Sequence, residues 1–199
     1  MALAKSRCSN EAGFSLFEVV IAMGVMTVGL VALAQLFALS TSANHSSRTT
    51  TFATMLAQQK MEQLRGLTWG FDTIGLPISD VTTDSSVVPQ ATGCPTSSAA
   101  GAGTGLSPSP GGTLADNVSG WVDYLDINGC LLSGGSTAPN RTIYIRRWSV
   151  EPLPTNPNNT LILQVLVTRR TDRGVADEGN VARMTEEARV MSIKTRKYK

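Results

Sequence analysis

The sequence predicts an α+β protein, in which one long N-terminal helix packs on an antiparallel sheet of three to five strands. Three observations support this prediction. Residues 19–39 form an apolar segment without a charged residue, a helical pattern of apolar residues returns over 52–67, and apolar residues alternate between 142 and 168. The helical patterns come first along the chain and the strand patterns follow them, which is typical of an α+β arrangement.

The composition argues against several classes of function. The chain has 199 residues and a formal net charge of +2, with no basic block of the kind that nucleic-acid binding usually requires. Its one histidine, His45, has no cysteine or carboxylate cluster around it in the sequence, and no phosphate-binding loop is present. We therefore expect no catalytic site, no cofactor and no metal site.

The apolar segment 19–39 is long enough to cross a membrane. Its clearly polar residues are Thr27 and Gln35, and as a helix it spans about 31 Å, the thickness of a bilayer core. A cleaved signal peptide and a plain membrane anchor are two interpretations. Neither accounts for Glu18 at the start of the segment, because a carboxylate costs roughly 2 to 3 kcal/mol at the bilayer centre and so implies a partner or a function.

A short motif precedes this segment. The order Gly13-Phe14-Ser15-Leu16-Phe17-Glu18, after a short polar leader, resembles the N-terminus of the type IV pilin superfamily. The resemblance is strongest over residues 7–67. It implies cleavage by prepilin peptidase between Gly13 and Phe14, and N-methylation of Phe14. It also implies a role for Phe14 and Glu18 in subunit assembly, in which the carboxylate meets the N-terminal ammonium of a neighbouring subunit.

The same resemblance implies how the chain is organised. Residues 1–13 would be the prepilin leader, 14–68 a long helix with its transmembrane part at about 19–39, and 69–199 a globular head. The subunit would cross the inner membrane once, with its N-terminus in the cytoplasm and its head outside, and would then enter a pilus or pseudopilus. Its partners would be other pilins or pseudopilins, which it contacts through the N-terminal helix.

One departure from the major pilins and one similarity to a group of minor pilins indicate the kind of subunit. Many major pilins carry a helix-kinking proline where this chain has Gln35, so the resemblance favours a minor pilin. Residues 29–36 and 57–65 look like the minor-pilin group called PilV-like. We expect a structural subunit that is assembled into, or primes, a type IV pilus. The alternatives are a minor pseudopilin of a type II secretion system, similar to GspI, and an adhesive or DNA-binding module at the pilus tip, whose ligand the sequence does not identify.

The elements of the head follow from local patterns. Residues 52–67 predict an amphipathic helix whose apolar stripe is interrupted by Lys60. Residues 77–120 predict a loop that is rich in glycine, serine and proline over about 85–120. The predicted strands are 121–126, 142–151 and 161–168, and residues 187–195 suit a last strand or a helix.

The cysteines and the polar residues of the head suggest three further features. Cys94 and Cys130 form a plausible disulfide if the head is extracytoplasmic, whereas Cys8 is lost with the leader. The pattern at Asp123, Asp126 and Asn128 resembles the opening of a calcium loop but lacks its other ligands, so we favour a hairpin turn and leave calcium open.

The third feature is a cluster of cations and aromatic residues that a DNA-binding tip would need. In a regular strand, however, these residues divide between the two faces, so we favour a structural role in the sheet. The cluster comprises Arg141, Tyr144, Arg146, Arg147 and Trp148.

Overall fold

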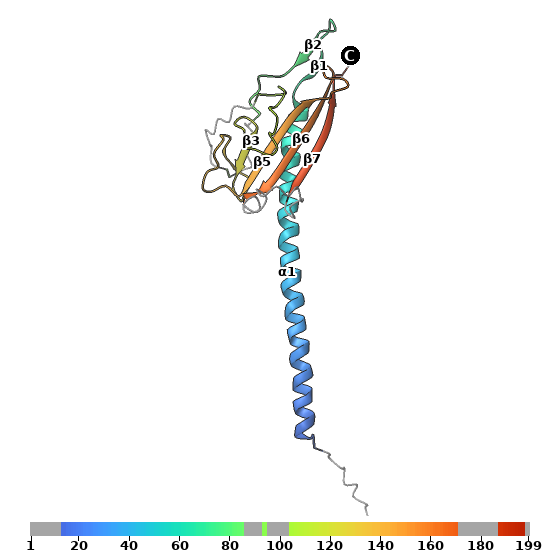
Figure 1. The fold of residues 1–199 in the computed structure, drawn as a ribbon, viewed down its shortest axis with the longest axis vertical. Coiled ribbons are helices and arrows are strands. Elements are labelled where there is room, and N and C mark those ends of the chain that lie inside the picture. The colour runs from blue at the N-terminus through green and yellow to red at the C-terminus, as the bar shows by residue number, and fades with distance from the viewer. Residues whose placement is uncertain (1–12, 86–92, 95–103, 171–186, 198–199) are drawn as a thin grey trace, which may run out of the picture. The chain divides into compact units, whose positions relative to one another are not determined.

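The computed structural model describes residues 13–85, 93–94, 104–170 and 187–197. These residues form one helix followed by seven strands (Figure 1). The chain divides into two compact units, Met1–His45 and Ser46–Lys199. The elements are α1 (Leu16–Gly66), β1 (Trp69–Phe71), β2 (Pro77–Ser79), β3 (Val122–Leu125), β4 (Leu131–Ser133), β5 (Tyr144–Pro152), β6 (Thr160–Arg169) and β7 (Ala188–Thr195).

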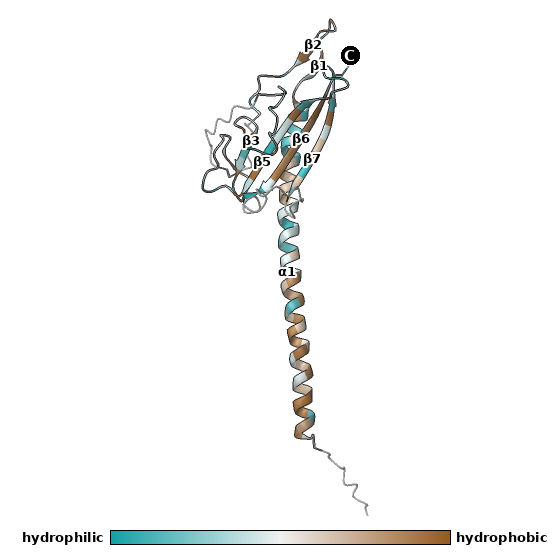
Figure 2. Cartoon of the chain, in the orientation of Figure 1, coloured by the Kyte–Doolittle hydropathy of each residue, from teal (hydrophilic) through white to brown (hydrophobic). Residues whose placement is uncertain are grey.

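The first unit contains the N-terminal part of α1. Ser15 stands just before the helix, where its side-chain Oγ accepts the N–H of Phe17 at 3.3 Å and its carbonyl accepts the N–H of Glu18 at 3.0 Å. Between Leu16 and Leu39 the large apolar side chains are exposed, and Figure 2 shows this stretch as predominantly hydrophobic. By length and composition α1 is able to cross a membrane. The predicted long apolar helix is therefore confirmed.

The second unit contains the sheets. Five antiparallel strands follow the order β4-β3-β5-β6-β7, and β1 and β2 form a separate two-stranded sheet. This arrangement confirms the predicted α+β class, and residues 187–195 form a strand rather than a helix over Ala188–Thr195. Strands β1, β2 and β4 were not predicted, and β2 lies inside the segment 77–120 that was expected to be loop. Parts of that segment, 86–92 and 95–103, lie outside the described residues.

The core of the second unit lies between one face of the five-stranded sheet and the C-terminal part of α1. The helix contributes the predicted stripe, and β6 contributes every second residue, so the alternation predicted for that strand is confirmed. The buried members are Ala53, Leu56, Ala57, Met61 and Leu64 from α1, Trp148 and Val150 from β5, and Leu161, Leu163, Val165 and Val167 from β6.

The C-terminal end of α1 is closed by a side chain from β7. The Nζ of Lys194 donates to the carbonyls of Arg65 at 2.5 Å and Leu67 at 2.6 Å, and lies 3.5 Å from that of Leu64. A helix end leaves such carbonyls without partners inside the helix, and a cation is favourable there because it complements the helix dipole. Strand β7 therefore helps to fix where the helix ends.

Candidate processing and assembly site and the buried charges of the head

The predicted cleavage site lies in the exposed segment before α1. Gly13 and Phe14 precede the helix, and the side chain of Phe14 is 83% exposed. A Cβ placed on Gly13 would meet no atom within 4 Å, so contacts with the described part of the chain do not require a glycine here. Residues 1–12 of the predicted leader lie outside the described residues.

The carboxylate predicted to act in assembly lies one turn further on. Glu18 is an exposed residue in the first turn of α1, where the helix dipole favours negative charge. Its neighbours Leu16 and Phe17 are also exposed. The segment thus presents one carboxylate among apolar side chains, and a cationic partner would satisfy it. Assembly through Phe14 and Glu18 stays a prediction.

The head contains a buried charge cluster, which we define as Lys60, Asp123 and Arg146. Asp123 of β3 and Arg146 of β5 are directly opposite each other in the sheet, and the Nη2 of Arg146 lies 2.7 Å from the Oδ2 of Asp123. The Nζ of Lys60, from α1, lies 3.0 Å from the same oxygen. All three side chains are fully buried. Two cations therefore share one carboxylate between the helix and the sheet.

Lys60 has further partners inside the core. Its Nζ donates to the carbonyl of Ser85 and lies 3.7 Å from the centre of the Trp148 ring, which attracts a cation through its π face. Burial lowers the pKa of Lys60 from 10.5 to about 8, against the opposing effect of the Asp123 carboxylate, and the nearby Arg146 adds to the lowering. Lys60 thus lies on the buried face of α1 and interrupts its apolar stripe with a charge that the core satisfies.

The arginines of β5 are structural. Arg146 also donates to the carbonyl of Leu56 and to the Oε1 of Gln59, both on α1 and both at 3.1 Å. Arg147 lies on the other face of the sheet and donates to the side chain of Asn117. Both arginines are buried, at 0% and 1% exposure, so they form no basic surface. These contacts support the structural role that we favoured for Arg146 and Arg147, whereas Arg141 of the same cluster is exposed.

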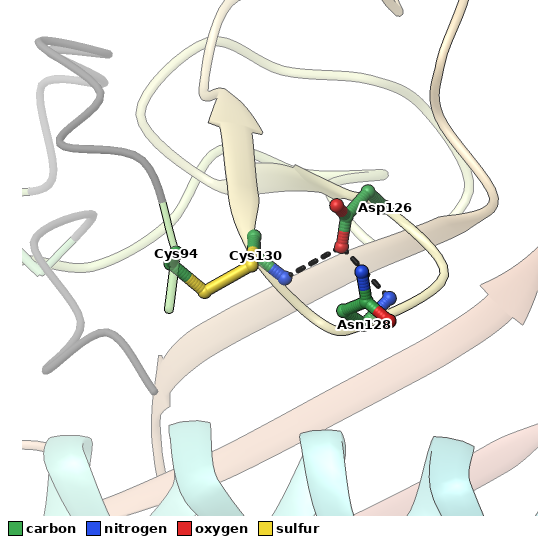
Figure 3. Close-up of a disulfide and its surroundings, with 4 residues drawn as sticks. All are labelled: Cys94, Asp126, Asn128 and Cys130. Atoms are coloured by element: carbon green, nitrogen blue, oxygen red, sulfur yellow. Dashed lines mark hydrogen bonds between the residues drawn. A yellow bond between two sulfur atoms is a disulfide. The ribbon is translucent and has the colours of Figure 1, made fainter. Parts of the chain in front are cut away.

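The residues suspected of binding calcium are engaged otherwise (Figure 3). The Oδ1 of Asp126 accepts the N–H groups of Asn128 and Cys130, each at 2.8 Å, and Gly129 adopts a φ of 81° that favours glycine. This is the hairpin turn that we favoured. Asp123 faces the buried charge cluster instead. In the part of the chain that the structure describes, no group of three histidine, cysteine or carboxylate side chains is arranged to hold a metal.

The structure contains the Cys94–Cys130 disulfide expected from the sequence (Figure 3). The two Cα atoms lie 5.5 Å apart, and Cys130 follows the Asp126 turn at the start of β4. The bridge joins residues separated by 36 positions in the sequence. It therefore anchors a point in the glycine- and serine-rich loop segment to the edge of the sheet.

The comparisons with known proteins concern the N-terminus. Residues 8–34 match the family model of the prokaryotic N-terminal methylation motif, which supports a type IV pilin-like protein. The motif implies processing by prepilin peptidase and assembly with other pilins, and its family is structural rather than enzymatic. Together with the apolar part of α1, it is consistent with a pilin anchored in the inner membrane. Neither the curated proteins nor the solved structures gave a match to the chain.

Proposed function

We propose that the protein is a minor pilin, a structural subunit that prepilin peptidase processes and that is assembled into, or primes, a type IV pilus. One observation carries the proposal: the methylation motif is followed directly by a helix whose apolar side chains are exposed from Leu16 to Leu39. An apolar helix of this length requires either a bilayer or the helices of neighbouring subunits around it. A subunit that leaves the membrane for a filament exchanges one of these environments for the other.

The proposed maturation defines the working parts of the chain. Cleavage after Gly13 leaves Phe14 as a methylated N-terminus, residues 14–68 as the long helix and 69–199 as the head. The segment at about 19–39 holds the subunit in the inner membrane with its N-terminus in the cytoplasm. The disulfide supports this orientation, since such bonds persist in oxidising compartments outside the cytoplasm.

Processing is tested by producing the full chain together with a prepilin peptidase and measuring the mass of the membrane-bound product. We expect a chain that starts at Phe14 and carries a methyl group on its amine. The matched control is Gly13→Val, which places a branched side chain beside the scissile bond and should keep the leader. A product that starts near Asn44 would instead identify an ordinary signal peptide and reject the proposal.

The assembly role is tested at Glu18. Replacing Glu18 with Ala should leave membrane insertion intact, because a carboxylate that is costly in a bilayer is removed. Recovery of the protein in filaments sheared from cells should fall strongly, because the ammonium of the neighbouring subunit loses its counter-charge. Glu18→Asp, which keeps the charge, is the matched control. Equal recovery of all three proteins would show that Glu18 has no role in assembly.

The minor pseudopilin of a type II secretion system remains the second candidate, because the same motif serves that class and the N-terminus is similar to that of GspI. The minor pilin and the minor pseudopilin are distinguished by deleting the gene in the cells that make the protein. A pilus subunit should change the number or length of surface filaments. A pseudopilin should instead leave secreted enzymes inside the cell.

A further inference from the structure

Strand β7 forms an open edge of the five-stranded sheet. It pairs with β6 from Thr160↔Thr195 to Val167↔Ala188, and among the described residues no strand pairs with the other side of Ala188–Thr195. Past the end of β7, an isolated bridge joins Gly70 to Lys197. An open edge presents unpaired backbone groups that can pair with another chain.

The two edges of the sheet differ in how they are protected. Strand β4, at the other edge, has three residues, pairs with β3 through a shifted register and begins beside the disulfide at Cys130. Strand β7 has eight residues, contains no proline and pairs without a register shift. Short length, bulges and proline are the usual means of protecting an edge, so β7 lacks the protection that β4 has.

The charged side chains of β7 do not shield it either. Arg189 donates to the Oε1 of Gln164 on β6 at 2.5 Å, and Lys194 is occupied at the end of α1. The side chains left at the middle of the strand are Met191 and Ile193, which are 65% and 63% exposed. An apolar pair of this kind on an open edge is a feature of interaction surfaces.

The backbone of the same residues points to the open side. The N–H of Arg196 donates to the carbonyl of Asn159 on the β6 side of the pair, and in an antiparallel ladder the direction alternates from residue to residue. The backbone N–H and C=O groups of even-numbered residues in β7 therefore point to β6. Those of odd-numbered residues, including Met191 and Ile193, point to the open side. Backbone pairing and apolar contact are thus offered by the same positions.

We propose that β7 binds an extended segment of a partner protein, which adds a strand to the sheet and has apolar residues at its middle and carboxylates at its ends. The charge pattern identifies the chemistry of this partner. The exposed residues along β7 and just beyond it are a cation, two apolar residues, a threonine and a second cation: Arg189, Met191, Ile193, Thr195 and Lys197. Residues 187–197 carry four cations and one carboxylate, a net charge of +3, so an acidic segment is attracted to this edge.

A second copy of the chain is a less suitable occupant. Two β7 strands related by a two-fold axis pair antiparallel. Any element that is parallel to β7 in one copy is then antiparallel to the same element in the other copy. Within Ser46–Lys199, β7 and the C-terminal part of α1 run in the same general direction (Figure 1), so the helices of the two copies would point in opposite directions. Subunits anchored in one membrane point them the same way. This step alone rests on the proposed function.

The test uses the purified full chain in detergent micelles and a fluorescent peptide, Glu-Thr-Val-Thr-Val-Thr-Val-Thr-Glu. The sequence of this peptide is the same in both directions, so it presents the same side chains whether it pairs parallel or antiparallel to β7. Its binding is followed by anisotropy. The control peptide carries lysine in place of both glutamates, and we expect it to bind at least about tenfold more weakly. Equal binding of the two peptides, or binding of neither, would overturn the proposal.

Variants of β7 identify the surface. Ile193→Pro removes an N–H that points to the open side and leaves the pairing with β6 intact, so it should weaken peptide binding at least about tenfold. Ile193→Thr keeps that N–H and should weaken binding less. Met191→Glu changes an exposed side chain only. It should also weaken binding, because it places a charge against the apolar centre of the peptide and repels the glutamates of the peptide.

The fold of each variant is checked by urea unfolding, which should give the wild-type midpoint. Undiminished binding by both Ile193→Pro and Met191→Glu would refute the assignment of this edge. Concentration-dependent dimers of the wild-type chain that Ile193→Pro abolishes would show that a second copy occupies the edge and would equally overturn the proposal. The mass of the processed chain is measured independently, so failure here leaves the proposed function standing.

Discussion

Lys60 provides a quantitative test of the buried charge cluster. Its ammonium is removed from water between α1 and the sheet, and burial lowers its pKa from 10.5 to about 8. Between these two values the unfolded chain binds a proton that the folded chain has released. The free energy of unfolding therefore rises with pH across this window and levels off above it. Lys60→Met removes the titrating group and keeps much of the side-chain volume.

The magnitude follows from the two pKa values. Between pH 7 and pH 10 the wild-type chain should gain roughly 2 to 3 kcal/mol of unfolding free energy over the variant. Lys194 also has a pKa lowered by burial, but it is present in both proteins, so its effect cancels in the difference. At neutral pH the variant retains the Asp123–Arg146 pair, so the buried carboxylate keeps a cationic partner.

The assay is urea unfolding of the full chain in detergent micelles, followed by tryptophan fluorescence. All three tryptophans, Trp69, Trp121 and Trp148, belong to the unit Ser46–Lys199, so the signal reports the head although the apolar part of α1 is present. The measurement compares the pH dependence of the two proteins. Parallel profiles from pH 7 to pH 10 would refute the reasoning, since they would mean that Lys60 titrates alike in the folded and unfolded chain.

Three further perturbations use the same assay. Asp123→Asn leaves two buried cations without a carboxylate and should cost about 3 to 5 kcal/mol; a loss below 1 kcal/mol would show that the cluster is not desolvated. Cys130→Ser should cost up to about 4 kcal/mol by releasing a closed loop, and an unchanged urea midpoint would contradict a disulfide in the native protein. Gly129→Ala should cost about 1 to 2 kcal/mol, because its φ is 81° and its Cβ would lie 3.0 Å from Leu56; wild-type stability would mean that the turn relaxes freely.

The helix and the longer strands could be predicted because their patterns are local. The stripe from Ala53 to Leu64 and the alternation in β6 each show one buried face at a fixed period. Strands β1, β2 and β4 have three residues each, which is too short for alternation to be visible. They are defined by backbone pairing with segments that local patterns do not identify.

The N-terminal motif could likewise be predicted from local sequence, whereas the buried charges could not. Gly13, Phe14 and Glu18 lie close together in the sequence, so a family resemblance was sufficient to select them. Lys60 could be recognised as a core residue only from the register that places Asp123 opposite Arg146, far along the chain. The local pattern does not show whether a lysine on an apolar stripe is buried with partners or marks an exposed position of the helix.

The closure of α1 by Lys194 has a consequence for the order of events during synthesis of the chain. The hydrogen bonds from Lys194 to the helix end join residues 127 to 130 positions apart. The C-terminal part of α1 is therefore synthesised long before the side chain that completes it. Long-range contacts of this kind form late, because chain closure must come first. A chain whose synthesis stops before β7 would still display an unfinished helix end, which gives proteases a means of distinguishing incomplete chains from complete ones.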